Sequence, residues 1–202
     1  MVCQTSPNWR KPIRTQQKEI VRDLASSIYN GMNVNDPDYL KHFFGGNHWK
    51  TPETSRKEYD VIASEIGNTE RVLDVGCGYN LLKGRLNVVG IDANNPAADH
   101  LIDLMNYDAD PESFDVVLAL GSVNIQPFSL VQQQVDRVIG WCRPGGRIYM
   151  RVNPCINRQD TPDNAYAWQL QDIVDITKHY GLQIIKPVTL TDRKRIIWTW
   201  QK

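Results

Sequence analysis

Short apolar runs recur along the chain from residue 71 onward, and each ends at a polar residue or a turn. They predict strands near 71–75, 87–91, 100–104, 114–120 and 146–152. The run Val116 to Leu120 is apolar at every position, which is typical of a parallel strand buried on both faces. Two later runs, 182–189 and 195–201, are separated by only five residues. We expect them to pair as an antiparallel hairpin.

Apolar residues at helical spacing predict the remaining elements. Ile20, Leu24 and Ile28 recur at every fourth residue within a helix expected over 14–30. A second helix is expected to begin at Pro52, after an N-cap at Thr51, and to stop at Gly67-Asn68, with Tyr59, Ile62 and Ile66 on its buried face. Two further helices are expected over 129–142 and 165–180. Between the first two helices, residues 35–50 form an irregular segment rich in aromatic residues.

Composition limits the functions that the chain can have. Its 202 residues, 41% of them hydrophobic, fit one domain with a real core. Lys plus Arg and Asp plus Glu both number 23, which argues against a whole surface built to hold polyanions. No apolar stretch is long enough to span a membrane, and the N-terminus lacks the apolar region of a secretory signal. We therefore expect a cytoplasmic protein.

The four cysteines do not indicate a metal centre. Cys3, Cys77, Cys142 and Cys155 form no CxxC pair, and no histidine lies at a spacing that completes a zinc site. We read them as reduced thiols and expect no bound metal.

The most informative stretch is residues 71–92, RVLDVGCGYNLLKGRLNVVGID. An apolar run leads into Asp74 and the turn Gly76-Cys77-Gly78, and a second apolar run ends at Asp92. This pattern is typical of a nucleotide-like ligand that is held across the carboxyl ends of neighbouring parallel strands.

With three later motifs, this stretch resembles the class I S-adenosylmethionine-dependent methyltransferases. The four signatures are LDVGCG at 73–78, GID at 90–92, SFDVVLAL at 113–120 and RPGGRIYM at 143–150. The resemblance covers residues 54–202. It implies an α/β fold, a Rossmann-like seven-stranded mostly parallel sheet with an antiparallel C-terminal hairpin and helices on both faces. Residues 1–53 would form a helical and irregular segment that covers the pocket.

The resemblance also implies a cofactor site for S-adenosylmethionine. Asp74 would face the cofactor's amino group, Asp92 would accept hydrogen bonds from both ribose hydroxyls, and Asp103 with Leu104 would meet the adenine. The complete expected set is Asp74, Gly76, Cys77, Gly78, Tyr79, Asp92, Ala93, Asp103, Leu104, Leu120 and Gly121. A nicotinamide dinucleotide is the alternative cofactor, but the turn reads GCGYNL, with Leu81 where a dinucleotide fingerprint has its third glycine.

Two connections depart from the family pattern. Only eight residues separate Gly78 from Asn87, and only seven separate Asp92 from His100. Parallel strands normally need a dozen or more residues to cross over. We expect each connection to be trimmed to a helical turn or a loop, which leaves the cofactor side of the sheet less covered.

Methyl transfer needs an acceptor held in line, and a general base where the nucleophile carries a proton. Candidate catalytic residues are His48, Ser122 and Asn124; candidate residues on the substrate side are Phe44, Trp49 and Arg56. Each has an ordinary structural alternative. Ser122 and Asn124 can cap the following helix, Phe44 and Trp49 can be core residues, and Arg56 can be a solvated helix residue. His48 can be a surface or packing histidine, and Tyr79 can simply pack.

The acceptor is the open part of the prediction. The Asn/Asp-Pro-Pro-aromatic motif of amide and adenine-N6 methyltransferases is absent after the fourth strand, where the chain reads GSVNI. Cys155 lacks the motif that surrounds a pyrimidine-methylating nucleophile. A compact and neutral chain favours a small-molecule acceptor. RNA, for which the basic cluster 193–195 is a candidate contact, and protein remain alternatives, as does a methyltransferase-fold protein that binds a partner without catalysis.

Overall fold

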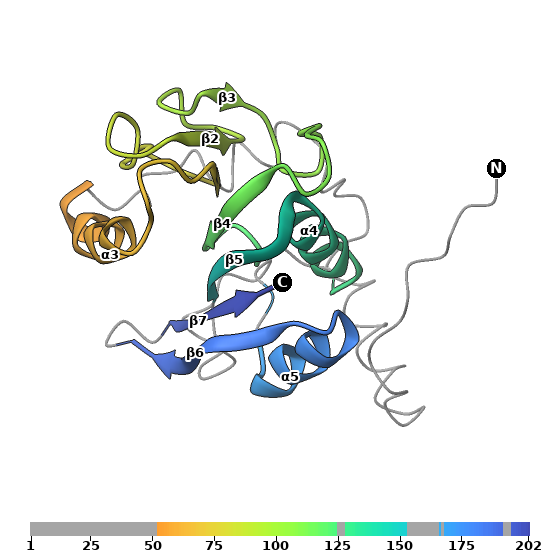
Figure 1. Cartoon of the computed structure of the whole chain (residues 1–202). Helices are drawn as coiled ribbons and strands as arrows, with labels where there is room; N and C mark the ends of the chain where they lie inside the picture. Colours follow the sequence, from red (N-terminus) through yellow and green to blue (C-terminus); the bar gives the residue numbers. More distant parts are fainter. Residues whose placement is uncertain (1–51, 125–127, 153–165, 167, 192–194) are drawn as a thin grey trace.

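A seven-stranded sheet organises the protein (Figure 1). The structure is a computed structural model that describes residues 52–124, 128–152, 166, 168–191 and 195–202. Its strands, in chain order, are β1 (Val72–Val75), β2 (Val88–Asp92), β3 (His100–Leu101), β4 (Phe114–Leu120), β5 (Cys142–Val152), β6 (Gln183–Leu190) and β7 (Ile196–Gln201). They lie in the order β3-β2-β1-β4-β5-β7-β6. β7 runs antiparallel to both of its neighbours, β5 and β6, and the other pairs of neighbouring strands are parallel, so the expected sheet and its C-terminal hairpin are confirmed.

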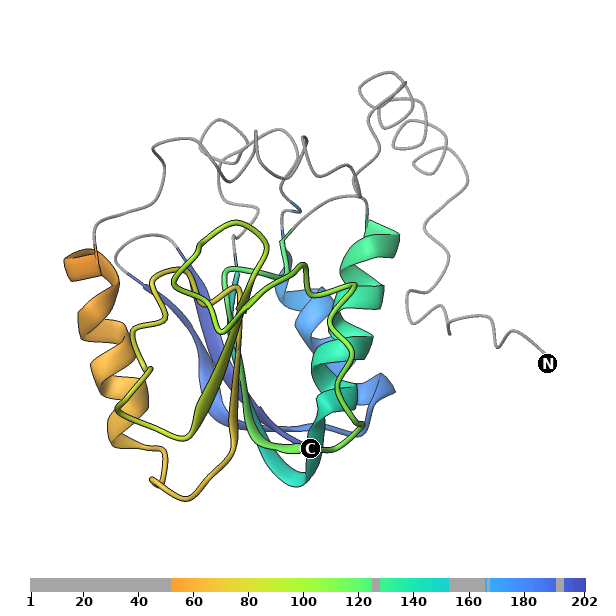
Figure 2. The same ribbon diagram turned by 90° about the horizontal axis from the view of Figure 1, so that it is seen from above.

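Helices cover both faces of the sheet. Helix α3 (Pro52–Ser64) lies on one face, and α4 (Phe128–Trp141) and α5 (Leu170–His179) lie on the other (Figure 2). The predicted buried face of α3 is confirmed, because Tyr59, Ile62 and Ile66 are 4%, 7% and 5% exposed. The larger core lies on the α4 and α5 side and includes Trp198 and Trp200 of β7. The result is the expected three-layer sandwich.

Three predicted boundaries were wrong. The third strand is only two residues long, not 100–104, because Asp103 turns the chain: its Oδ1 accepts the Met105 N–H at 2.8 Å. The fifth strand starts at Cys142, not at 146. It already pairs with β4 at Cys142, the pairing is irregular over Pro144-Gly145-Gly146, and it resumes at Arg147. Helix α5 starts at Leu170, not 165, because Gln169 and Asp172 form a capping box there.

Polar contacts replace the helices that the two short connections lack, and neither connection contains a helix, as predicted. The Asn80 amide donates to the Ala97 carbonyl at 3.1 Å and to Asp99 Oδ2 at 3.0 Å. Asp99 also accepts the Gly90 N–H at 2.9 Å and pairs with Lys83 at 2.6 Å. The first connection is thereby fastened to the second and to β2.

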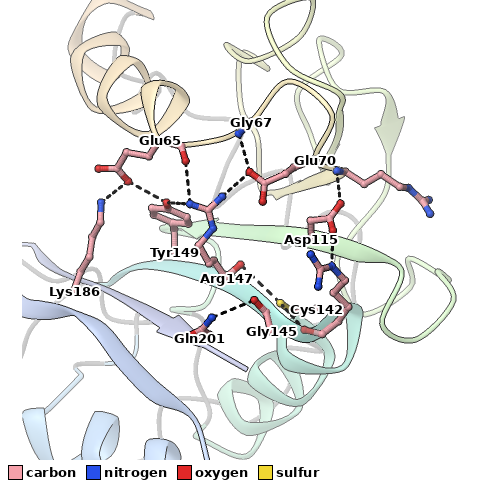
Figure 3. A network of polar contacts seen from close by, with 12 residues as sticks. Glu65, Gly67, Glu70, Asp115, Cys142, Gly145, Arg147, Tyr149, Lys186 and Gln201 are labelled. Atoms are coloured by element: carbon pink, nitrogen blue, oxygen red, sulfur yellow. Dashed lines mark hydrogen bonds and ion pairs between the residues drawn. The ribbon is translucent and has the colours of Figure 1, made fainter.

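Charged side chains join α3 and the turn after it to the C-terminal half of the sheet (Figure 3). Arg147 of β5 pairs with Glu70 at 2.6 Å and donates to the Glu65 carbonyl at 3.0 Å. The Glu65 carboxylate accepts the Tyr149 hydroxyl at 3.0 Å and pairs with Lys186 of β6. These contacts fix the position of α3 at one edge of the candidate site.

Several predictions lie outside the described residues: the helix over 14–30, the segment 35–50 and the N-cap Thr51, as well as Cys3 and Cys155. Among the residues that are described, no helix is long and apolar enough to cross a membrane. In the same part of the chain, no group of His, Cys, Asp and Glu side chains is arranged to hold a metal ion.

Candidate functional site

The turn after β1 places backbone where side chains are excluded. Gly76 and Gly78 have φ angles of 68° and 53°, in the left-handed region that favours glycine. A Cβ atom on Gly76 would lie 2.7 Å from the Cβ of Ser122, which follows β4. The Gly76 and Cys77 N–H groups both donate to the Ile91 carbonyl of β2, at 2.8 and 3.0 Å. The turn is therefore packed tightly between the carboxyl ends of β1, β2 and β4.

Asp74, in β1 two residues before Gly76, is a buried carboxyl group to which no described residue donates in normal hydrogen-bond geometry. It is fully buried, and neither carboxylate oxygen accepts a hydrogen bond of normal geometry. Burial raises the pKa of Asp74 to about 7, and the Asp92 carboxylate adds to the effect, while the nearby Tyr59 hydroxyl and Arg151 guanidinium oppose it. A buried carboxylate in this state is suited to a cationic ligand group.

Asp92, at the end of β2, is oriented by the backbone around it. Its Oδ2 accepts the Gly78 N–H at 3.0 Å, and its Oδ1 accepts the N–H groups of Asn94 and Asn95, each at 2.9 Å. A carboxylate offers about four acceptor sites, so capacity remains for a ligand hydroxyl. Cys77, between the two glycines, is no nucleophile: burial first, then Asp74 and Asp92, raise the pKa of its thiol far above the usual range.

The end of β4 forms the next border of the site. Leu120 is 6% exposed, and Gly121 follows it with a φ of 110°. The Ser122 Oγ is buried without a hydrogen-bond partner beside the glycine turn. Asn124 is 6% exposed and its amide donates to the Gly121 carbonyl at 2.8 Å. This hydrogen bond closes the turn after β4, where the sequence predicted residues on the substrate side.

Sequence reasoning missed two side chains beside Asp74, those of Arg151 and Tyr59. Arg151, at the carboxyl end of β5, pairs with Glu58 of α3 and donates to the Leu120 carbonyl. Tyr59 of α3 is buried, and burial, with the Asp74 charge adding to it, holds the pKa of its hydroxyl well above the usual range. The available signal was position: Arg151 is the last charged residue of the predicted strand 146–152, at the edge where ligands bind in such sheets.

The other predicted site residues differ in their exposure and in their position relative to the glycine turn. Tyr79 is 40% exposed, and Ala93 begins the second connection. Asp103 starts the turn after β3, but the Leu104 side chain is buried in the core against the α4 side. Arg56 is exposed on α3. The structure thus brings together Asp74, Gly76, Cys77, Gly78, Asp92, Leu120, Gly121 and Ser122, whereas His48, Phe44 and Trp49 lie outside the described residues.

Comparison by sequence finds no relatives. No family model matches the chain, and no curated protein matches it.

Comparison by structure finds a shared fold. A Burkholderia thailandensis 1,6-didemethyltoxoflavin-N1-methyltransferase, solved with 1,6-didemethyltoxoflavin and S-adenosylhomocysteine, superposes with a TM-score of 0.61 at 15% identity, over 96% of this chain and 92% of that one. A Leishmania major S-adenosylmethionine-dependent methyltransferase gives 0.60 at 13% identity, over 89% and 90%. The [4+2]-cyclase SpnF gives 0.56 at 14% identity, over 93% and 94%.

The chain therefore has the fold of the class I S-adenosylmethionine-dependent methyltransferases. Because one of the similar structures is a cyclase, the fold by itself does not assign the reaction.

Proposed function

We propose that the protein is an S-adenosylmethionine-dependent methyltransferase that acts on a small molecule. The observation that carries this proposal is Asp74, a fully buried carboxyl group to which no described residue donates in normal hydrogen-bond geometry, next to a glycine turn and a second buried acid, Asp92. Leaving such a group unpaired costs free energy, and a ligand that supplies a cation removes the cost. A methyltransferase of the same fold was solved with S-adenosylhomocysteine bound.

The residues present fit this cofactor. The ammonium group of its methionine part would pair with Asp74, and Gly76 with Gly78 would let that part approach the backbone without a clash. Asp92, held in orientation by three backbone N–H groups, would accept ribose hydroxyls, with Ala93 beside it. The turn at Asp103 and Leu104 would border the adenine. Leu120 and Gly121, together with Cys77 and Tyr79, would complete the binding set.

The bound cofactor would supply a sulfonium methyl group for in-line displacement. The protein's contribution would be to hold the two reactants in line and to exclude water. Ser122 would contact the acceptor through its unpartnered Oγ, and Asn124 would keep the turn after Gly121 in place. Among the candidate bases, we keep His48; Phe44 and Trp49 stay proposed acceptor contacts. Arg56, exposed on α3, is the weakest of the proposed contacts.

Binding of S-adenosylhomocysteine, measured by titration calorimetry, tests the cofactor assignment. We expect the wild-type protein to bind it and Asp92→Ala to lose at least 100-fold in affinity, because the variant loses both the ribose acceptor and the contact that orients Gly78. Asp110→Ala removes an exposed carboxylate and serves as the matched control, with unchanged affinity. Failure of the wild-type protein to bind S-adenosylmethionine or S-adenosylhomocysteine would refute the proposal.

Catalysis is separated from binding by incubation with S-adenosylmethionine and a metabolite library. A methyltransferase releases S-adenosylhomocysteine and a product heavier by one methyl group, which mass spectrometry detects. A binding protein of this fold retains the cofactor without turnover, and an enzyme of another class, as the cyclase neighbour exemplifies, changes a substrate without consuming the cofactor.

A further inference from the structure

Two arginines lie on the same face of the sheet at its carboxyl edge. On β5, Ile148, Met150 and Val152 point into the core under α4 and α5, so the alternate residue Arg151 points to the α3 side. On β7, Ile196 and Trp198 are in that same core, which places Arg195, just before the strand, on the α3 side as well.

The strand register brings these two side chains together. Arg151 is directly opposite Ile197 in the antiparallel β5–β7 pair, so Arg195 is its diagonal neighbour on one face. Diagonal neighbours lie about 7–8 Å apart between Cα atoms, within reach of long side chains. The Thr191 N–H donates to the Arg195 carbonyl at 2.8 Å, and Thr191 Oγ1 accepts the Arg195 N–H at 3.1 Å, which fixes the backbone at this point.

The two charges are balanced differently. Glu58 neutralises Arg151. Arg195 is partly buried, and in the described part of the chain no acidic side chain forms an ion pair with it. Burial and the charge of Arg151 both lower the pKa of Arg195. A partly buried cation beside a second cation is unfavourable unless an anion joins them.

The location separates Arg195, though not Arg151, from the cofactor's amino acid. In the order β1-β4-β5-β7, Arg195 is two strands away from Gly121 and three from Asp74. At about 4.8 Å per strand, it lies roughly 10 Å from the end of β4 and roughly 14 Å from the end of β1. The charge that acts on Asp74 is that of Arg151 and not that of Arg195, whereas an acceptor whose reacting atom lies over Gly121 would span the shorter distance to Arg195.

We infer that Arg195, with Arg151 beside it, binds an oxyanion of the methyl acceptor, so that the acceptor is a small molecule with a carboxylate or a phosphate group. This inference rests on the proposed function, because it takes the end of β4 as the place of methyl transfer. An Arg guanidinium presents parallel N–H donors that match both anions. Arg195 would then determine acceptor specificity, and Arg151 would link the acceptor site to the cofactor site.

Titration of the full chain, saturated with S-adenosylhomocysteine, tests the inference with simple probes. Inorganic phosphate and benzoate are added at constant ionic strength, and the arginine Nε–H signals are followed by NMR. We expect at least one of the two anions to shift the Arg195 and Arg151 signals, and Arg195→Gln, in which the Arg151 signal reports binding, to weaken the affinity for that anion at least 10-fold. Benzamide, which has the shape of benzoate without the charge, should not shift either signal. Which anion binds more tightly identifies the group.

Matched controls keep the outcomes distinct. Arg85→Gln removes an exposed arginine of the first connection, which pairs with Asp60, and should leave anion binding unchanged. The affinity for S-adenosylhomocysteine should be the same in Arg195→Gln and wild type. Failure of the wild-type protein to bind S-adenosylhomocysteine would overturn the proposed function. If the cofactor binds but neither anion does, or if Arg195→Gln binds the anions as tightly as the wild type, this inference alone would be overturned. A single-stranded 12-nucleotide RNA that binds more tightly than both anions and depends on Arg195 would also overturn it in favour of a nucleic acid acceptor.

Discussion

The half of the sheet formed by β1, β2 and β3 has no helix in its connections, whereas in the half formed by β5, β7 and β6 the two tryptophans of β7, Trp198 and Trp200, share a core with buried residues of α5. The first half depends on polar contacts: Asp99 and Asn80 tie the two short connections together. In the second half, Trp198 and Trp200 pack edge to face with ring centroids 5.0 Å apart. Trp200 also donates to Thr177 of α5 at 2.8 Å.

The two halves of the sheet have different roles: one mainly stabilises the fold, and the other contains the proposed cofactor site. Apolar burial provides most of the folding free energy, so the tryptophan half can support a neighbouring half that keeps polar groups unpaired. Asp74 of β1 is such a group, because it is buried and no described residue donates to it in normal hydrogen-bond geometry. The tryptophan half also contains a buried polar atom without a described partner, Trp198 Nε1, but among the described residues only Asp74 is an unpaired buried carboxyl group, which is the kind of group that a cationic ligand stabilises.

The largest expected effect is a loss of folding stability caused by a substitution in the tryptophan core. Trp200→Ala should lower the free energy of unfolding by about 3–5 kcal/mol, because it empties a fully buried ring position and leaves Thr177 without its donor. Urea denaturation measures the change. Ile185→Ala, on the exposed face of β6 at 41% exposure, is the control and should cost less than about 1 kcal/mol. Equal effects of the two substitutions would contradict the assigned role of the tryptophan core.

Asp74→Asn should act in the opposite direction on the ligand-free protein. The pKa of Asp74 is about 7 in the folded state, against 3.8 in its ordinary state. The folded state therefore prefers the protonated form, and the contribution of Asp74 to stability is lost as the pH rises from about 4 through 7. The uncharged amide escapes this loss. We expect the variant to be more stable than wild type at pH 8, by up to about 4 kcal/mol, with the difference shrinking towards pH 4.

The same variant should lose affinity for S-adenosylhomocysteine, because the amide carries no charge to pair with an ammonium group. Denaturation at pH 5 and pH 8 and calorimetry on one preparation measure both effects, and Asp110→Asn is the matched surface control. A variant that is less stable than wild type at pH 8, or that binds the ligand unchanged, would remove Asp74 from its assigned role.

The smallest expected effect concerns Asp99, which joins the two short connections by polar contacts. Lys83, the Gly90 N–H and the Asn80 amide hold the pKa of Asp99 at about 2, although partial burial acts to raise it. Its stabilisation is therefore present above about pH 4 and is lost as the pH falls through 2. Since the site is largely solvent-accessible, we expect Asp99→Asn to cost only about 1 kcal/mol at pH 7. Denaturation at pH 7 and pH 3 should show the cost diminishing at the lower pH; a cost that grows there would contradict the ion-pair account.

The sequence predicted the fold well where the signal was local. Continuous apolar runs located β1, β2 and β4, and the five-residue gap after the sixth strand indicated the antiparallel hairpin. The short connections were also predictable, because a count of residues is enough to exclude a crossover helix. Boundaries failed at Asp103 and at Gly145, where a side-chain hydrogen bond and a pairing irregularity, neither visible in an apolar pattern, ended or extended a strand.

For the candidate site, the sequence by itself determined which acids and glycines adjoin the strand ends: Asp74, Gly76 and Asp92 are fixed by motif and position. Only the tertiary structure decided what surrounds them. Glu58 and Arg151 are 93 residues apart in the chain and meet because α3 packs over β5. Arg195 lies near Arg151 because two antiparallel strands share one register. Burial and charge at a site depend on these distant neighbours, so the raised pKa of Asp74 and the unpaired arginine emerge from the packing of the chain.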